Sequence, residues 1–381
     1  MTYFIIAGEA SGDLHGSNLI KAIRQRDNEA VFVGLGGDKM KEAGCNLIQH
    51  ISKMAYMGVI AVVSNLNSIR GNFKLTQQAL LLHRPDVLVL IDYPSFNLRI
   101  AHYAKQHLPL THIAYYIPPK IWAWKTRRVH RIAKLSDVVL GIFPFEPDFY
   151  ARFGYQCTYI GNPVSENIRL WQQANAAIQD PNEQDIIKIA LLPGSRRNEI
   201  NRCLDKMMRA ATEVKKQLEK ERKKTNIYIA AAPGIEQQLY SRYENDATIT
   251  NDTYKLVSQA TAAVVNSGTA TLETALLGCP QTAVYHVTGS KYLWWLKPLI
   301  FKIPFFTLVN IIAGKEVIRE LIAQHFTQME IQQELLRLIS DNCYREQMKD
   351  NYRLISSLLG ETDTADTAAK HIVQLAKIKT I

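Results

Sequence analysis

The chain has 381 residues, of which 47% are hydrophobic, and it has a formal net charge of +10. This length fits two domains, and this hydrophobic share favours packed cores over a disordered chain. The charge favours a phosphate-bearing partner, such as nucleic acid, an anionic membrane or a phosphorylated substrate, although a merely basic surface is an equal alternative. The five cysteines are scattered without a CxxC pair, which argues against a zinc site and a disulfide framework.

No targeting or membrane-spanning segment is expected. The chain enters an apolar strand over Tyr3–Ala7 without the basic region of a signal peptide. No uninterrupted apolar run reaches the roughly 18 residues that a spanning helix needs. These features predict a cytoplasmic protein.

Short apolar runs alternate with amphipathic segments along the first half of the chain. The runs predict strands over Tyr3–Ala7, Val31–Leu35, Val87–Ile91, His112–Tyr116, Val138–Gly141 and Thr158–Ile160. Helices are predicted between most of them, over Asp13–Arg26, Ser68–Leu82 and Leu98–Gln106. This alternation predicts a parallel sheet with helices on both faces.

The pattern lapses around residues 165–185, where the polar stretch Gln173–Asp185 predicts a linker. A second alternation follows, with strands over Ile187–Leu192, Ile227–Ala231, Ala262–Val265 and Gln281–Tyr285, helices over Arg197–Lys220 and Thr269–Leu277, and helical segments over Lys315–Lys377. We therefore predict an N-terminal domain over residues 1–165, a second domain over 186–360, and a C-terminal helix over 361–381 that could return to the first domain. Two such domains in series place a ligand cleft between them, at the carboxyl ends of both sheets.

Two acidic residues follow predicted strands in the first domain. Glu9 lies in the turn Gly8–Asp13, whose glycine spacing is not the dinucleotide fingerprint, and Asp92 directly follows Val87–Ile91. A carboxylate at the carboxyl end of a parallel strand is placed to act as a general base toward a sugar hydroxyl. The structural alternatives are an ordinary turn with Asp13 near a helix start and a helix cap at Asp92.

The segment Tyr115–Lys125 combines two prolines with Trp122 and Trp124, and a basic run begins at Lys125. Two tryptophans two residues apart cannot share one helix face, so at least one could face a ligand. Aromatic and basic side chains together suit a sugar, a phospholipid or nucleic acid. Because the chain has no RNA-binding signature, we expect no nucleic-acid partner.

Two strand-to-helix turns of the second domain suit a nucleotide. One contains Gly194 and Arg196, and the other is Asn266–Glu273. Free N–H groups, a guanidinium and the Ser267 and Thr269 hydroxyls could hold a diphosphate, and a carboxylate one turn later could accept hydrogen bonds from a ribose. Solvated arginines and an ordinary cap at Thr269 are the alternatives. The occurrence of both turns in one domain nevertheless favours nucleotide binding.

An aromatic and apolar segment, Tyr292–Phe306, is interrupted by lysines and prolines, so it is too broken to span a bilayer. An exposed membrane-contacting patch and a buried core helix are equal alternatives for it.

These motifs resemble, in the same order and with similar spacing, those of the lipid-A-disaccharide synthases. The matching segments are Gly8–Asp13, Ile91–Asp92, Trp122–Trp124, Phe143–Glu146, Leu191–Arg196, Ser267–Glu273 and Asn310–Gly314. The resemblance runs from about residue 3 to residue 375. It implies an α/β fold of GT-B glycosyltransferase architecture, with two facing Rossmann-like domains, a C-terminal helical segment, and UDP bound mostly by the second domain.

The resemblance also implies a reaction. An inverting transfer would join UDP-2,3-diacylglucosamine to 2,3-diacylglucosamine 1-phosphate (lipid X), giving the β-1,6-linked lipid A disaccharide 1-phosphate and UDP. It would need neither a metal nor another cofactor, and it would take place at the inner-membrane surface of a Gram-negative bacterium. Acyl-chain length, oligomeric state and the surface that touches the membrane are left open.

The resemblance implies roles for individual residues. Asp92 would be the base for the acceptor hydroxyl, and Glu9 would be an alternative base or would position a sugar. The residues implied on the donor side are Arg196, Glu199, Ser267, Gly268, Thr269, Ala270, Thr271, Glu273, Asn310 and Glu316. Those implied on the acceptor side are Ser11, Asp13, Trp122, Trp124, Lys125 and Arg128.

Three positions depart from the family pattern. Ser95 stands where a second acid is common, Asn162 where a histidine is common, and Ala61 where a glutamate is common. Rival interpretations are a UDP-sugar 2-epimerase or a peptidoglycan-type N-acetylglucosaminyltransferase of the same fold, and a non-enzymatic membrane-binding protein with a vestigial nucleotide site. The Gly8–Asp13 and Trp122–Trp124 segments weigh against the two rival enzymes.

Overall fold

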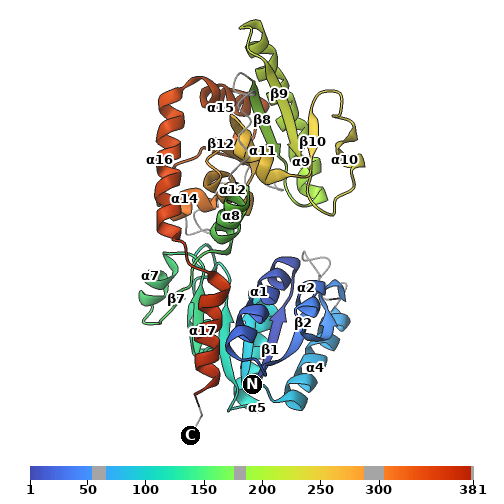
Figure 1. Ribbon diagram of the computed structural model, residues 1–381, viewed down its shortest axis with the longest axis vertical. Helices are drawn as coiled ribbons and strands as arrows, with labels where there is room; N and C mark the ends of the chain where they lie inside the picture. The colour runs from blue at the N-terminus through green and yellow to red at the C-terminus, as the bar shows by residue number, and fades with distance from the viewer. Residues whose placement is uncertain (54–65, 176–185, 287–303, 379–381) are drawn as a thin grey trace. The chain divides into compact units, whose positions relative to one another are not determined.

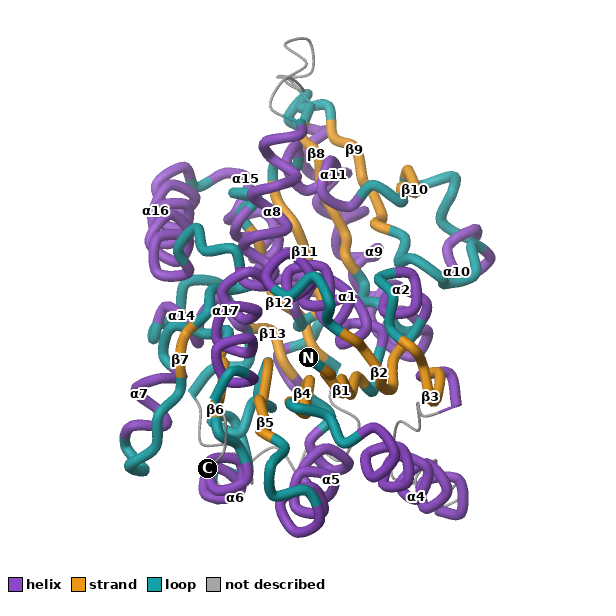
Figure 2. The backbone as a smooth tube through the Cα atoms, turned by 60° about the horizontal axis from the view of Figure 1, so that its bottom comes forward, coloured by secondary structure: helices purple, strands orange, loops and turns teal. Residues whose placement is uncertain are grey.

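The computed structural model describes residues 1–53, 66–175, 186–286 and 304–378 (Figure 1). The chain forms two compact units, one made of Met1–Glu166 with Glu361–Ile381 and the other of Asn167–Gly360. We call them unit 1 and unit 2. In each unit a parallel β-sheet is covered by helices on both faces, as the alternating sequence pattern predicts (Figure 2).

The sheet of unit 1 has the order β3-β2-β1-β4-β5-β6-β7, and all its pairings are parallel. Its strands are β1 (Thr2–Ala7), β2 (Val31–Gly36), β3 (Asn46–His50), β4 (Val87–Ile91), β5 (His112–Tyr116), β6 (Val138–Gly141) and β7 (Thr158–Tyr159). Its helices are α1 (Ala10–Arg26), α2 (Asp38–Glu42), α4 (Leu66–His83), α5 (Pro94–His107), α6 (Arg128–Leu135), α7 (Glu146–Ala151) and α17 (Thr364–Ala376), and α8 (Pro163–Ala174) begins in this unit and ends in unit 2.

Two hydrophobic cores lie on the two faces of this sheet, because successive strand side chains point to opposite faces. Tyr3 and Ile5 of β1 face the layer that contains α1 and α17. Phe4 and Ile6 face the layer that contains α5 and α6. Helix α17 comes from the end of the chain and packs along α1 (Figure 1). Ile372 of α17 is fully buried there, so the last helix is part of the core of unit 1.

The sheet of unit 2 has the order β10-β9-β8-β11-β12-β13 and is also parallel. Its strands are β8 (Ile187–Leu192), β9 (Thr225–Ala230), β10 (Thr248–Thr250), β11 (Ala262–Asn266), β12 (Gln281–Tyr285) and β13 (Glu320–Ile322). Its helices are α9 (Arg197–Lys220), α10 (Gln238–Ser241), α11 (Thr253–Gln259), α12 (Thr269–Leu276), α14 (Leu308–Ala313), α15 (Gln328–Ser340) and α16 (Asn342–Leu359).

Every strand predicted from an apolar run is present, with its ends displaced by two residues or fewer. The sequence patterns missed three of the described strands, β3, β10 and β13, which all lie at sheet edges. Edge strands are short and partly exposed, so they lack the continuous apolar run of a central strand. The helical prediction over Lys315–Lys377 was wrong at its start, because β13 forms there.

The predicted linker over Gln173–Asp185 begins inside α8, which continues to Ala174, and residues 176–185 lie outside the described part of the chain. Residues 292–303 of the predicted apolar segment and Ala61 lie outside it too. Among the helices that are described, none is both long enough and apolar enough to cross a membrane.

Candidate active site

Both sheets have a switch point, where the strand order reverses beside the first strand of the unit. In unit 1, β1 lies between β2 and β4, and in unit 2, β8 lies between β9 and β11. Open α/β sheets bind ligands at the carboxyl ends of the strands that flank such a point. The loops at these positions contain Glu9 and Asp92 in unit 1, and Arg196 and Ser267 in unit 2.

The turn after β4 has strained backbone geometry. Asp92 and Tyr93 both have φ of 43°, in the left-handed region that residues other than glycine rarely occupy. Three hydrogen bonds fix the turn: the Asp92 N–H donates to the Ile117 carbonyl (3.1 Å), and the Asp92 carbonyl accepts from Asn97 Nδ2 (2.8 Å) and from the Tyr115 hydroxyl (2.8 Å). Strain that the surroundings enforce in this way is common at active sites.

The Asp92 side chain is exposed at the carboxyl end of the central strand β4, but it does not have the pKa of a free carboxyl. Desolvation by the surrounding protein and the negative charge of Glu9 raise the pKa of Asp92, while Lys120 and a hydrogen bond from the Tyr93 N–H act to lower it. Tyr93 is the N-cap residue of α5, and its side chain forms no capping hydrogen bond. Asp92 is therefore an accessible carboxylate of increased basicity rather than the cap of that helix.

Glu9 stands beside this turn because Gly8 permits close packing. A Cβ atom on Gly8 would overlap the ring of Tyr93, so a glycine is required where the two loops meet. Glu9 is the N-cap residue of α1, and its exposed side chain makes no capping hydrogen bond. Ser11, in the first turn of α1, is exposed as well. Both side chains are thus available to a ligand.

Asp13 has a different role from the predicted acceptor contact. Its side chain is 4% exposed, and its carboxylate accepts hydrogen bonds from the N–H groups of Gly37 (2.7 Å), Lys39 (3.1 Å) and Met40 (3.0 Å). These groups form the N-terminus of α2, which leaves its first N–H groups without helical partners. Asp13 therefore ties α1 to α2 and is not accessible to a substrate.

The two tryptophans lie in different environments. Trp122 is buried, packs edge-on against Phe143 and Phe145, and donates from Nε1 to Glu146 (3.2 Å), so the prediction that it contacts the acceptor is corrected. Burial raises the pKa of Glu146 to about 7, although it accepts hydrogen bonds from the backbone and from Trp122. Trp124 is 46% exposed.

The side chains after Trp124 keep some exposure. The Lys125 ammonium lies 4.2 Å from the centre of the Trp124 ring, and both residues are exposed. Arg128, at the start of α6, is half-buried. Of the residues predicted on the acceptor side, Ser11, Trp124, Lys125 and Arg128 thus remain accessible.

In unit 2, the loop after β8 is shaped by Gly194 and Glu199. Gly194 has φ of 121°, and a Cβ atom there would lie 2.6 Å from Glu199 Oε2 and 2.8 Å from Asn266 Nδ2. Glu199 accepts hydrogen bonds from the Ser195 N–H (3.1 Å) and from Arg196 Nη1 (3.2 Å). Glu199 therefore holds the loop, and the Arg196 guanidinium, whose side chain is 62% exposed, has further N–H groups that can bind an anion.

The loop after β11 opens onto the N-terminus of α12. Gly268 and Thr269 are exposed, Ser267 and Ala270 are half-buried, and a Cβ atom on Gly268 would meet nothing within 4 Å. Gly268, not Thr269, is the N-cap residue, and no side chain caps the helix in the described structure. The first N–H groups of α12 thus point toward an open position where an anion could bind.

Two predicted donor residues, Thr271 and Asn310, are buried. The Thr271 hydroxyl donates to the Gly268 carbonyl (2.9 Å). The Asn310 side chain donates to the Ile318 carbonyl (2.8 Å) and accepts from the N–H groups of Val317 (2.8 Å) and Ile318 (3.0 Å). Neither side chain can contact a nucleotide directly, because its polar groups already bind the protein. Asn310 instead shapes the loop that follows the exposed Glu316.

Glu273 lies one turn into α12 and is half-buried. Its Oε1 accepts a hydrogen bond from the Tyr254 hydroxyl (3.2 Å), and burial raises its pKa. A pocket of about 390 Å³ also lies in unit 2, lined by Ala231–Ile235 after β9 and by Ile249 and Asn251 around the end of β10. Gln237 and Tyr240 complete its lining. Sequence patterns did not reveal this pocket, because its lining comes from two loops that are apart in the sequence.

Lys120 is a further residue that the patterns missed. It lies in the loop after β5, and the charges of both Asp92 and Glu146 act on it, while desolvation lowers its pKa. Lys120 directly follows two prolines, and this sequence context did not indicate that it interacts with the two carboxylates. Among the described residues, no group of three His, Cys, Asp or Glu side chains is arranged to hold a metal ion.

Solved structures define the class of this fold. The calicheamicin glycosyltransferase CalG4 is similar with a TM-score of 0.60 at 13% identity, covering 100% of this chain and 99% of that chain. The UDP-GlcNAc 2-epimerase from Neisseria meningitidis, solved with UDP-GlcNAc, is similar with a TM-score of 0.57 at 11% identity, covering 98% and 99%. The chain thus has the two-domain α/β architecture of the GT-B glycosyltransferases, which these epimerases share.

Sequence comparisons identify the family within that class. The family model for lipid-A-disaccharide synthetase matches residues 3–373. The lipid-A-disaccharide synthase of Myxococcus xanthus is 35% identical over 378 residues, covering 97% of this chain and 96% of the relative, and that of Syntrophus aciditrophicus is 34% identical over 388 residues, covering 98% and 97%. The chain belongs to the lipid-A-disaccharide synthetase family and is a glycosyltransferase of lipid A biosynthesis.

Proposed function

We propose that the enzyme joins UDP-2,3-diacylglucosamine to 2,3-diacylglucosamine 1-phosphate, with release of UDP and formation of the β-1,6-linked disaccharide 1-phosphate. The observation that best supports this reaction is the strained, accessible Asp92 at the switch point of unit 1. Relatives that match nearly the whole chain are named lipid-A-disaccharide synthases, and this name describes the proposed product.

Asp92 is the proposed general base. It accepts the proton of the acceptor 6-hydroxyl while that oxygen bonds to the anomeric carbon of the donor. The bond from this carbon to the diphosphate breaks at the same time, and its electron pair goes to the departing UDP. A single displacement of this kind inverts the anomeric configuration. The raised pKa of Asp92 supports the assignment, because a more basic carboxylate accepts a proton more readily.

The donor diphosphate is assigned to the two switch-point loops of unit 2. Arg196 and the free N–H groups at the start of α12 would stabilise the negative charge that develops on the leaving group, with Ser267 and Thr269 as further donors. Glu273 would accept from the ribose. The pocket lined by Ala231–Ile235, Gln237 and Tyr240 would take the base, since it offers both apolar surface and hydrogen-bonding groups.

The proposed chemistry involves no metal ion, because the guanidinium and the helix N–H groups take the role of a cation. The proposed location is the inner-membrane surface of a Gram-negative bacterium, with peripheral attachment. The formal net charge of +10 supports that location, since anionic lipids attract basic proteins.

The test is to incubate the purified protein with both diacylated sugars, with and without EDTA, and to follow the product by mass spectrometry. We expect the disaccharide 1-phosphate and UDP in equal amounts, with no loss in EDTA. Absence of product over several acyl lengths, from a protein that still binds UDP, would refute the proposed substrates. Turnover of unacylated UDP-N-acetylglucosamine would then favour one of the related UDP-sugar enzymes.

A further inference from the structure

A basic pocket lies on unit 1, on the helical layer formed by α5 and α6. It has a volume of about 330 Å³ and is lined by His102, Arg127, His130, Arg131, Lys134 and Leu135. Three of these six side chains are cationic, two are histidines, and none is acidic. The pocket therefore has a positive charge that its own lining does not neutralise.

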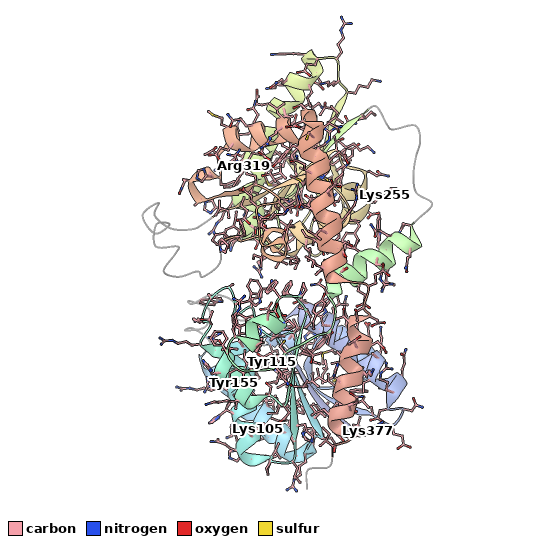
Figure 3. The ribbon with its side chains drawn as sticks, turned by 90° about the vertical axis from the view of Figure 1, so that its left-hand side faces the viewer. Lys105, Tyr115, Tyr155, Lys255, Arg319 and Lys377 are labelled. Carbon is pink, nitrogen blue, oxygen red and sulfur yellow. The ribbon has the colours of Figure 1, made fainter. Side chains whose placement is uncertain are left out.

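The surrounding structure leaves this charge largely uncompensated. No carboxylate of the described residues lies within 4.0 Å of the charged groups of Arg127 or Lys134. Asp137, which follows α6, has its carboxylate bound at 2.7 and 2.9 Å by Lys105, labelled in Figure 3. A cluster of cations without counter-ions attracts an anion from solution.

Other contacts hold the pocket wall in place. His130 Nδ1 lies 3.1 Å from the hydroxyl of Tyr155, which is labelled in Figure 3. Arg131 Nη2 donates to the carbonyl of Leu98 at 3.4 Å, which connects α6 to α5. The ring of Phe153, which is 36% exposed, stands edge-on to His130 at 5.6 Å. The charged pocket thus has an exposed aromatic residue at its border.

We propose that this α5–α6 pocket binds the phosphate group of an anionic phospholipid headgroup. Guanidinium and ammonium groups complement phosphate oxygens, and the volume leaves room for more than the phosphate alone. An exposed aromatic ring beside the cations is typical of a membrane–water interface. The inference rests on the peripheral attachment proposed above, but on no step of the transfer reaction.

A soluble phosphate compound and nucleic acid are the competing occupants. A free phosphate would use the same cations but would not need the exposed Phe153 ring. Single-stranded nucleic acid normally stacks successive bases on a series of aromatic side chains, whereas the described structure gives this pocket one exposed phenylalanine, Phe153, beside its two histidines. The combination of cations with an apolar border therefore favours the lipid headgroup.

The experiment measures binding of the full chain to sedimented vesicles of phosphatidylcholine, with and without phosphatidylglycerol. The test variant is Arg127→Ala/Lys134→Ala, and the control variant is Lys220→Ala/Lys224→Ala, which removes two exposed cations from unit 2. We expect the anionic vesicles to bind the wild type and the control equally. The test variant should bind them roughly tenfold more weakly or worse, because each cation at an anionic surface contributes to attachment.

Each other outcome has a distinct meaning. Equal weakening of both variants would show that only overall charge matters, and unchanged binding of the test variant would show that another surface attaches; either result overturns the proposal. If phosphatidylglycerol does not increase the vesicle binding of the wild type, the proposed peripheral attachment is itself refuted. Loss of inorganic phosphate or RNA binding in the test variant, with vesicle binding intact, would assign the pocket to that ligand instead. Turnover in detergent, measured on the same samples, reports on the reaction independently.

Discussion

The carboxylate of Asp92 shows how one side chain acquires its properties from distant parts of the chain. Its backbone is held at a left-handed φ by a carbonyl after β5, an amide from α5 and a tyrosine hydroxyl from β5. Its pKa is set by desolvation and by two opposite charges, Glu9 and Lys120. The proposed base can thus be tested by changing either the carboxylate or its neighbours.

Replacing the carboxylate tests the base directly. We expect Asp92→Asn to lower kcat by about 10²- to 10⁴-fold, the range that general bases contribute, with UDP affinity unchanged. Asp148→Asn makes the same chemical change in α7 of the same unit and should leave kcat within twofold, or about 0.4 kcal/mol. Steady-state kinetics and UDP titration check both variants. Full activity in Asp92→Asn would transfer the role of base to Glu9.

Replacing the neighbours tests the electrostatics. A base is active when deprotonated, so activity should rise with pH through the pKa of Asp92. Glu9 raises that pKa, so Glu9→Gln should move the acid limb of the kcat/KM profile to lower pH. Lys120 lowers it, so Lys120→Met should move the limb to higher pH. Shifts in the same direction would contradict the assignment of the limb to Asp92, and complete loss of activity in Glu9→Gln would favour Glu9 as the base.

At the scale of elements, α1 and α2 depend on one buried carboxylate. The Asp13 oxygens are the acceptors for three N–H groups at the start of α2. Charged acceptors at a helix N-terminus also interact favourably with the helix dipole. This arrangement explains why an acid in the Gly8–Asp13 motif is needed for structure rather than for substrate.

Its replacement should therefore reduce stability. Asp13→Asn removes the charge and turns an amide donor toward the Lys39 N–H, so we expect a loss of roughly 1.5–3 kcal/mol in the free energy of unfolding. Asp38→Asn, at a side chain that is 81% exposed, should change it by less than about 0.5 kcal/mol. Urea unfolding followed by circular dichroism measures both. A loss of activity in Asp13→Asn without any loss of stability would point instead to the predicted acceptor contact.

At the scale of the whole molecule, the chain finishes unit 1 only with its last residues. Unit 2 occupies Asn167–Gly360, and Glu361–Ile381 then returns to unit 1, where α17 packs on α1. Gly161 and Thr362 are in close contact, and the Thr364 N–H donates to Glu166 (3.0 Å), so the outgoing and returning chains meet. Unit 1 therefore needs both ends of the chain.

A core substitution in α17 tests this dependence. Ile372 is fully buried against unit 1, so Ile372→Ala should destabilise that unit by about 2–5 kcal/mol. The UDP affinity assigned to unit 2 should not change. Leu354→Ala, at a half-exposed position of α16, is the control and should have little effect on stability. Chemical denaturation measures the stability of each variant, and a UDP titration of the same variant reports on unit 2. Parallel loss of UDP binding and of stability would show that the two units unfold together.

The sequence alone predicted most of the fold and part of the candidate site. The buried central strands were located almost exactly, because a strand that is covered on both faces needs a continuous apolar run, and such a run is visible without tertiary information. The ordered motifs gave the family, which the comparisons confirm. The exposed candidates Asp92, Glu9 and Arg196 follow the strand ends that such a fold uses for ligands.

The tertiary structure decided which polar side chains are free. Asp13, Trp122, Thr271 and Asn310 belong to the same motifs as the exposed candidates, but they are buried and hydrogen-bonded within the protein. Edge strands, the strained turn at Asp92, the influence of Lys120 and the basic pocket on α5 and α6 also depend on packing between distant segments. A local pattern shows which side chains are polar, whereas their burial and hydrogen-bond partners arise only when separate segments pack together. Burial and hydrogen-bond partners then determine whether a polar group supports the fold or remains available to a ligand.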